Sequence, residues 1–169
     1  MELIDFPPFY TLQLNPATRA KQFEAWSSVL RTSLPGFVIN IDEQDDPVFI
    51  NKKISRSLST EGKIELCSYL KDHALGYWLT PDSKFLFYRI PVEDWATAIH
   101  TWADKSGKIN SIESVFSVIN GDESKGEVFH GIPSEIALNA FRALEGRGKC
   151  ELTFREPNDM MSCGVKFFS

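Results

Sequence analysis

The sequence predicts an α+β fold in which one small unit, built from helices followed by a β-hairpin, occurs twice. Two observations support the repeat. Pairs of helix-like segments recur in the same order with nearly equal offsets, and each pair precedes two short β-rich stretches separated by a proline-containing turn. At 169 residues, with 43% hydrophobic and 24% charged residues, the chain has the composition of an ordinary folded protein.

The first segment of each half predicts an amphipathic helix. In the first half it runs over about 16–31, where Asn15 is a suitable N-cap and a proline occupies the first helical position. The counterpart in the second half follows Pro91. Apolar residues spaced three and four apart share one helix face in each case: Phe23, Trp26 and Leu30 in the first half, and Trp95, Ile99 and Trp102 in the second.

A later helix also occurs in both halves. Ser59 or Thr60 can cap a helix that reaches about Leu75, and its counterpart begins near Pro133 and Ser134. Three apolar pairs match at an offset of 74: Ile64, Cys67 and Leu70 with Leu138, Phe141 and Leu144. Two helices that repeat in order at nearly equal offsets indicate a true internal repeat.

Shorter elements complete each half. A short helix is predicted weakly over 47–53 and more clearly over 112–119, where Asn120-Gly121 ends it. The β-rich pairs are 77–79 with 85–90, and 150–154 with 165–168.

The order helix, short extended piece, helix, helix and hairpin is that of a winged-helix domain. We therefore predict an extended docking tail over 1–14 and two tandem winged-helix domains over 15–90 and 91–169. Each domain has a three-helix core with a β-hairpin wing. A unit of this size buries only about 60% of its chain surface, and an aromatic content of 12% adds large buried areas to the core.

Composition restricts the classes of function. A net charge of −5, from 23 acidic and 18 basic residues, is not that of a chain-wide nucleic-acid-binding surface. No apolar run approaches the roughly 18 residues of a membrane-spanning helix, and the first five residues lack the basic region of a signal peptide. Three scattered cysteines fit a reducing compartment. We expect a cytoplasmic protein whose cysteines serve in packing.

Motifs for catalysis or metal binding are few. The three histidines, His73, His100 and His130, lie far apart in the sequence, and no HExxH, nucleotide-binding loop or nucleophile elbow is present. Gly146-Arg147-Gly148 is typical of a helix stop. The stretches 42–47 and 157–162 match no functional pattern. We expect no enzymatic activity, no metal site and no cofactor.

Winged helices often bind DNA through the third helix, so the charge of these helices tests that function. Charges nearly cancel on both predicted third helices: Glu61, Lys63, Glu65, Lys71 and Asp72 on the first, and Glu135, Arg142 and Glu145 on the second. The wings add few basic residues: Lys84, Arg89, Arg155 and Lys166. Groove-entering helices usually carry several Arg or Lys residues. Protein binding is therefore favoured, and a nucleic-acid-binding transcription regulator is the alternative.

The N-terminal stretch Phe6-Pro7-Pro8-Phe9-Tyr10 is the sharpest functional signal. Two prolines favour polyproline II, which lowers the entropy lost on docking, and the aromatic rings supply anchors. Phe9 and Tyr10 are predicted to project from the first domain without belonging to its core. Two other interpretations remain: a capping strand that folds onto its own domain, and a PPxY ligand for a WW domain.

Several stretches resemble the small-subunit family of the ESCRT-II complex, and together they cover nearly the whole chain. They are FPPFYTLQLNPATRAKQ at 6–22, EDWATAIHTWADKSGKINS at 93–111, NGDES and FHGIP within 120–133, ALNAFRALEGRGKCEL at 137–152 and GVKFF at 164–168. The resemblance implies tandem winged helices, no catalysis, and a role in sorting ubiquitinated membrane cargo into multivesicular endosomes. It also implies recruitment to the endosomal membrane through the complex.

The resemblance further implies a docking role for the N-terminal motif. In the family a PPxF tail docks onto the two larger winged-helix subunits, which identifies Pro7, Pro8, Phe9 and Tyr10 as partner-binding residues. Tyr10 stands where the family usually has phenylalanine.

A second partner is implied for the second domain, which in the family recruits the first-acting ESCRT-III subunit. Exposed positions on the third helix, such as Asn139 and Arg142, or on the adjacent wing are the first candidates for that contact.

Overall fold

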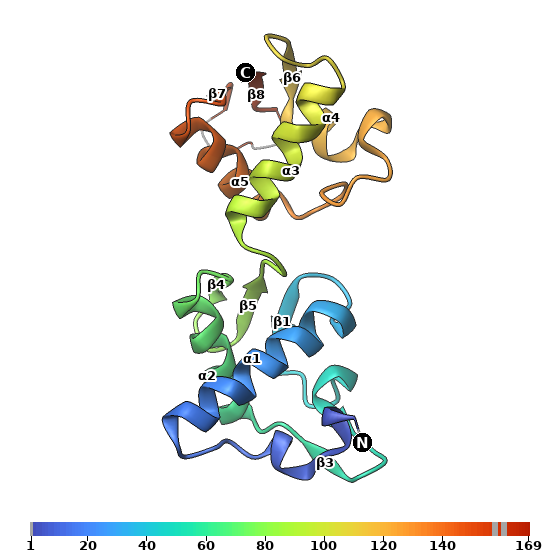
Figure 1. Ribbon diagram of the computed structural model, residues 1–169, viewed down its shortest axis with the longest axis vertical. Helices are drawn as coiled ribbons and strands as arrows, with labels where there is room; N and C mark the ends of the chain where they lie inside the picture. The colour runs from blue at the N-terminus through green and yellow to red at the C-terminus, as the bar shows by residue number, and fades with distance from the viewer. Residues whose placement is uncertain (1, 157–158, 160–161) are drawn as a thin grey trace. The chain divides into compact units, whose positions relative to one another are not determined.

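The chain forms two compact units, Met1–Arg89 and Ile90–Ser169, in a computed structural model (Figure 1). The structure describes residues 2–156, 159 and 162–169. The division between the units lies one residue from the predicted boundary at 90 and 91. Most of the stretch 157–162, with its predicted hairpin turn, lies outside the described residues.

The first unit combines helices with two small antiparallel sheets (Figure 1). Its α-helices are α1 (Pro16–Ser33) and α2 (Thr60–Asp72). The larger sheet has the order β1-β5-β4, formed by β1 (Val38–Asn40), β4 (Gly76–Thr80) and β5 (Lys84–Phe87). The smaller sheet pairs β2 (Ile50–Asn51) with β3 (Arg56–Ser57).

The second unit repeats the arrangement with an additional α-helix. Its helices are α3 (Val92–Lys105), α4 (Val115–Asn120) and α5 (Ser134–Gly146). Its antiparallel sheet has the order β6-β8-β7, formed by β6 (Ile112–Ser114), β7 (Cys150–Thr153) and β8 (Gly164–Phe167). Helix, strand, two helices and a hairpin follow one another, which is the winged-helix order.

Local sequence signals set the helix ends as predicted. The Asn15 side chain accepts hydrogen bonds from the main-chain N–H groups of Ala17 and Thr18 at the start of α1, at 3.0 and 3.1 Å. Ser59 accepts from the N–H of Gly62 at 3.0 Å at the start of α2. The predicted helix stop after α5 is also confirmed, since Gly148 follows with a φ of +70° that favours glycine.

The repeated apolar positions form the cores of the two units. Phe23, Trp26 and Leu30 of α1 are buried, and so are their counterparts Trp95 and Trp102 of α3. The second set of matched pairs also behaves alike. The first members, Ile64 and Leu138, are half-buried, whereas the other four are buried: Cys67, Leu70, Phe141 and Leu144. Matched burial at matched positions confirms the internal repeat.

The predicted helix over 47–53 is wrong, because only its first three residues are helical. A 3₁₀ helix covers only Pro47–Phe49, and Ile50 then pairs with Ser57 in the β2–β3 hairpin. The proline sets the first turn, and Asp46 caps it by accepting from the N–H of Val48 at 3.0 Å. The first unit therefore has a 3₁₀ helix and a hairpin where the second unit has α4.

The acidic stretch before this turn is fixed by contacts within the unit. The buried Lys63 ammonium donates to the carbonyl of Glu43 at 2.9 Å and lies 5.2 Å from the ring centroid of Phe49. Ser83 donates to the carboxylate of Asp42 at 2.5 Å. These contacts give residues 42–46 a structural role.

Candidate partner-docking site

Residues 3–10 contain two short 3₁₀ helices rather than the extended tail predicted from the sequence. The helices span Leu3–Asp5 and Pro7–Tyr10, and the N–H of Phe9 donates to the carbonyl of Phe6 at 2.9 Å. The fixed φ of proline, near −65°, suits a 3₁₀ turn as well as polyproline II. The prolines alone therefore do not decide the conformation. We refer to residues 2–14 as the N-terminal segment.

Phe9 and Tyr10 belong to the core of the first unit, which corrects the prediction that they project from it. Their exposed fractions are only 3% and 7%. The Phe9 ring stacks on Trp26 with centroids 4.3 Å apart and planes 9° from parallel, and Tyr10 meets Trp26 edge-on at 5.5 Å. Burial of large aromatic area against α1 selects the turn, which the fixed φ of the prolines also permits.

Gln22 of α1 binds the main chain of the N-terminal segment. Its amide nitrogen donates to the carbonyl oxygens of Phe9 and Thr11, at 3.0 and 2.7 Å, and its amide oxygen accepts from the N–H of Gln13 at 3.2 Å. The indole N–H of Trp26 donates to the same Phe9 carbonyl at 3.0 Å. Sequence reasoning missed Gln22, although its position four residues before Trp26 puts both on one helix face.

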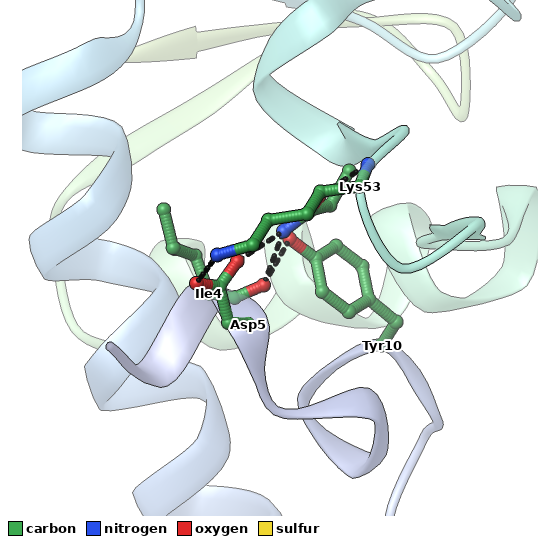
Figure 2. A network of polar contacts seen from close by, with 5 residues as sticks. Ile4, Asp5, Tyr10 and Lys53 are labelled. Carbon is green, nitrogen blue, oxygen red and sulfur yellow. Dashed lines mark hydrogen bonds and ion pairs between the residues drawn. The ribbon is translucent and has the colours of Figure 1, made fainter. Parts of the chain in front are cut away.

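A polar network joins the other end of the segment to the β2–β3 hairpin (Figure 2). The Tyr10 hydroxyl donates to the carbonyl of Ile4 at 3.0 Å, and the Asn51 side chain donates to the same carbonyl at 2.7 Å. Asn51 also donates to Asp5 at 3.0 Å, and Lys53 forms an ion pair with Asp5 at 2.6 Å.

The surroundings of the network shift the pKa values of its ionisable groups. The hydrogen bond from Lys53, followed by that from Asn51, lowers the pKa of the Asp5 carboxyl, and the contact with Asp5 raises the pKa of Lys53. Burial raises the pKa of the Tyr10 phenol. The segment is thus held by an ion pair at one end and by an amide and an indole at the other.

The PPxY interpretation does not agree with this structure. A WW ligand presents its prolines in a polyproline II helix, whereas Pro7–Tyr10 is a 3₁₀ helix. Tyr10 is buried, and its hydroxyl is already bound to Ile4.

The outer side of the N-terminal segment is an exposed apolar surface. Leu3 and Phe6 each have an exposed fraction of 47%, and Pro7 and Pro8 are exposed as well. With Ala25 and other residues of α1, several of these side chains line a groove of about 280 Å³. We call Leu3, Phe6, Pro7 and Pro8 the docking face. Exposed apolar clusters of this kind on an ordered element are typical of protein-binding surfaces.

The second unit presents the residues predicted to contact the ESCRT-III subunit on one helix. Both Asn139 and Arg142 belong to α5, and Arg142 is exposed whereas Asn139 is half-buried. Exposed apolar side chains occur elsewhere in this unit, at Ile112, Phe116 and Val128.

The structure weakens the case for nucleic-acid binding. Lys63, one of the basic residues of α2, is only 3% exposed and donates to a main-chain carbonyl, so it is not available to phosphate. The Arg89 guanidinium donates to the carbonyls of Arg31, Leu34 and Gly36. Two of the positive charges counted toward a basic face thus serve the internal structure of the first unit.

The sequence predicts no catalytic or metal site, and the surroundings of His130 are those of a residue bonded within its own unit. His130 contacts the Ser124 hydroxyl at 3.0 Å. In the described residues, no group of three or more His, Cys, Asp or Glu side chains is placed to hold a metal ion. Among the helices of the described ranges, none combines the length and apolar character needed to cross a bilayer.

Comparison with known proteins gives matches over most of the chain. Residues 3–133 match the family described as ESCRT-II complex subunit. The chain is 36% identical to "Vacuolar protein-sorting-associated protein 25" of Xenopus laevis, with 97% of this chain and 95% of that protein covered. It is 32% identical to the Homo sapiens protein of the same name, with 96% and 93% covered.

Solved structures give the same fold. A crystal structure of subunit VPS25 of the endosomal trafficking complex ESCRT-II matches with a TM-score of 0.81 at 22% identity, covering 99% of this chain and 97% of that one. A chain in the crystal structure of the endosomal complex ESCRT-II (VPS22/VPS25/VPS36) matches with a TM-score of 0.79 at 21% identity, covering 99% and 98%.

Proposed function

Because this chain belongs to the family of ESCRT-II complex subunits, we propose that it is a non-enzymatic subunit that assembles with the larger subunits corresponding to VPS22 and VPS36. The complex sorts ubiquitinated cargo into multivesicular bodies and brings this subunit from the cytoplasm to the endosomal membrane. Relatives matched over more than nine-tenths of their length support this assignment. So does the solved complex that contains both larger subunits.

The docking face carries the proposed assembly. Phe6 and the two prolines lie on an ordered segment that is already bonded to α1, so little conformational entropy is lost when a partner binds. Pro7 and Pro8 contact the larger subunits directly. Phe9 and Tyr10 support the same interface indirectly, because their buried rings pack on Trp26 and fix the position of the segment.

The expected loss of affinity for the larger subunits can be estimated from the aromatic residue of the docking face. Truncation of one aromatic hot spot costs about 2–4 kcal/mol of binding free energy, which is roughly 30- to 1000-fold in affinity. Phe6 is the aromatic residue of the docking face, so its truncation is the change that tests the surface most directly. Its half-exposed ring contributes little to the core, and the free chain is expected to keep its stability.

The second unit recruits the first-acting ESCRT-III subunit through its α5 side. Arg142 supplies an exposed positive charge on this helix, and Asn139 lies one turn earlier. Reversal of the charge at Arg142 is expected to change mainly the association rate if the residue lies at the rim of the contact.

Purification of the tagged full chain from cells of its own organism at native expression tests the assignment. The larger subunits corresponding to VPS22 and VPS36 are expected in stoichiometric amounts, and an ESCRT-III subunit in smaller amounts. Recovery of nucleic acid that decreases with salt, without either larger subunit, would contradict the proposal and favour the nucleic-acid-binding regulator.

A further inference from the structure

Gln22 is a polar residue on the buried face of α1. Its exposed fraction is 7%, and it lies one turn before the fully buried Trp26. Burial of an amide is unfavourable unless its donors and acceptor are bonded. The partners of the Gln22 side chain therefore indicate what its amide does.

The Gln22 side chain hydrogen-bonds to the main chain of the N-terminal segment. Both donor bonds end on carbonyl oxygens of the segment, at Phe9 and Thr11, and the amide oxygen accepts from the N–H of Gln13. The amide therefore holds the backbone over residues 9–13 at three points. Because these contacts are to backbone atoms, they fix the path of the segment and not the identity of its side chains.

Main-chain hydrogen bonds between residues three apart link residues 9–13 to the docking face. The N–H of Phe9 donates to the carbonyl of Phe6 at 2.9 Å, and the N–H of Thr11 donates to the carbonyl of Pro8 at 3.1 Å. Gln22 itself lines the groove together with Phe6 and Pro8. Gln22 thus binds the carbonyls of Phe9 and Thr11, and the N–H groups of the same two residues bind Phe6 and Pro8. Through these contacts the Gln22 amide helps to set the positions of Phe6 and Pro8.

We infer that Gln22 is a positioning residue for partner docking, which rests on the proposed function. Its amide holds the N-terminal segment in the turn that presents Phe6 and Pro8 side by side to the larger subunits. Without the amide, the segment spends only part of its time in that turn, and the apparent affinity falls in proportion to the competent fraction.

The test uses the full chain with Gln22→Met, which keeps the length and volume of the side chain and removes its hydrogen bonds. The same change at the exposed Gln44 is the matched control. Affinity for the larger subunits is measured by titration, and the order of the segment by amide hydrogen exchange over residues 6–13. We expect Gln22→Met to weaken binding at least tenfold, which is about 1.4 kcal/mol, and to accelerate exchange in the segment. The Gln44 variant is expected to change neither quantity.

A second variant, Gln22→Glu, keeps the acceptor for Gln13 but places a carboxylate oxygen against the carbonyls of Phe9 and Thr11. Protonation of that carboxylate returns one O–H donor. The loss of affinity relative to the native chain is therefore expected to be larger at pH 8 than at pH 5. This dependence on pH also tests the inference if Gln22→Met fails to fold. A loss that is the same at both pH values would contradict it.

The remaining outcomes separate this inference from the docking proposal. Native affinity of Gln22→Met, or tighter binding as expected if the segment must be released to dock, overturns the role of Gln22. Weaker binding with unchanged exchange over 6–13 overturns it as well. A third variant, Phe6→Ala with Pro8→Ala, truncates two of the four side chains of the docking face and keeps the Gln22 amide. Native affinity in that variant contradicts the proposed docking itself.

Discussion

Replacement of Phe9 by alanine is expected to destabilise the free chain, because its ring is buried rather than projecting from the domain as the sequence predicts. The ring has an exposed fraction of 3% and stacks on the fully buried Trp26 at 4.3 Å. Truncation of a buried phenylalanine costs about 3–5 kcal/mol of the free energy of unfolding. The stacked geometry contributes roughly 0.5–1.5 kcal/mol of that total. We expect the lower end, about 3 kcal/mol, because the short 3₁₀ helix that carries Phe9 relaxes more readily than a long α-helix.

The corresponding change in melting temperature is large enough to measure easily. For a domain of 60–100 residues, 1 kcal/mol shifts the midpoint by about 4–8 °C, so 3 kcal/mol corresponds to roughly 12–24 °C. Circular dichroism of the full chain follows the transition. The shift should be confined to the transition of the first unit, since Phe9 belongs to the Met1–Arg89 unit. The matched control is Phe6→Ala, at a half-exposed ring of the same segment, which should leave the midpoint nearly unchanged.

An unchanged midpoint in Phe9→Ala would refute this reasoning. It would mean that the ring leaves Trp26 in solution at no cost, as expected for a tail that projects from the domain. The docking role of Phe9 would then be direct, by insertion of its ring into a partner, rather than indirect through support of the docking face.

Three further outcomes are expected. The side chains of Cys67, Cys150 and Cys163 are buried, and burial raises the pKa of each thiol. The pKa of Cys150 is raised to about 12. None should react with a maleimide in the native chain at pH 7, and all should react in denaturant, as mass spectrometry can show; rapid native labelling would contradict their burial. The Asp5 pKa is lowered in the folded chain, so its contribution to stability is present above its unfolded pKa and lost as pH falls through the lowered value, below about pH 4. Asp5→Asn should remove that part of the acid dependence of melting, and an unaltered profile would show that the contact with Lys53 contributes nothing. A fragment of residues 90–169 should melt cooperatively, and Trp102→Ala should cost it about 3–5 kcal/mol because the ring is buried and its N–H is bonded to Glu123 at 3.2 Å; a fragment without a cooperative transition would show that the second unit does not fold alone.

The elements of the fold could be predicted where the signal is local. Asn15 is predicted as a cap, and Ser59 is one of two candidates with Thr60, because such side chains satisfy N–H groups two or three residues ahead, within one turn. The buried positions of α1 and α3 followed from spacing alone. The short helix over 47–53 was wrong because Ile50 pairs with Ser57 across a hairpin, and no spacing rule reports such a pairing.

The conformation predicted for the N-terminal motif is wrong, and its docking role stays a prediction. Two prolines before Phe9 predict an extended chain when only neighbours are considered. The turn is selected by Trp26 and Gln22, which are 17 and 13 residues away from Phe9 in the sequence. Their effect depends on the packing of the segment against α1. For the same reason Lys63 was counted as a surface charge, although it is buried against the loop before the 3₁₀ turn at 47–49.

Docking through the N-terminal segment is tested by titration of the larger subunits with the full chain, either native or carrying Phe6→Ala and Pro8→Ala together. We expect the double variant to melt like the native chain and to bind at least about 30-fold more weakly, because an exposed hot-spot aromatic is lost without loss of core packing. Native affinity in the double variant, with an unchanged melting temperature, would contradict the claim that the chain docks through the outer side of its folded N-terminal segment.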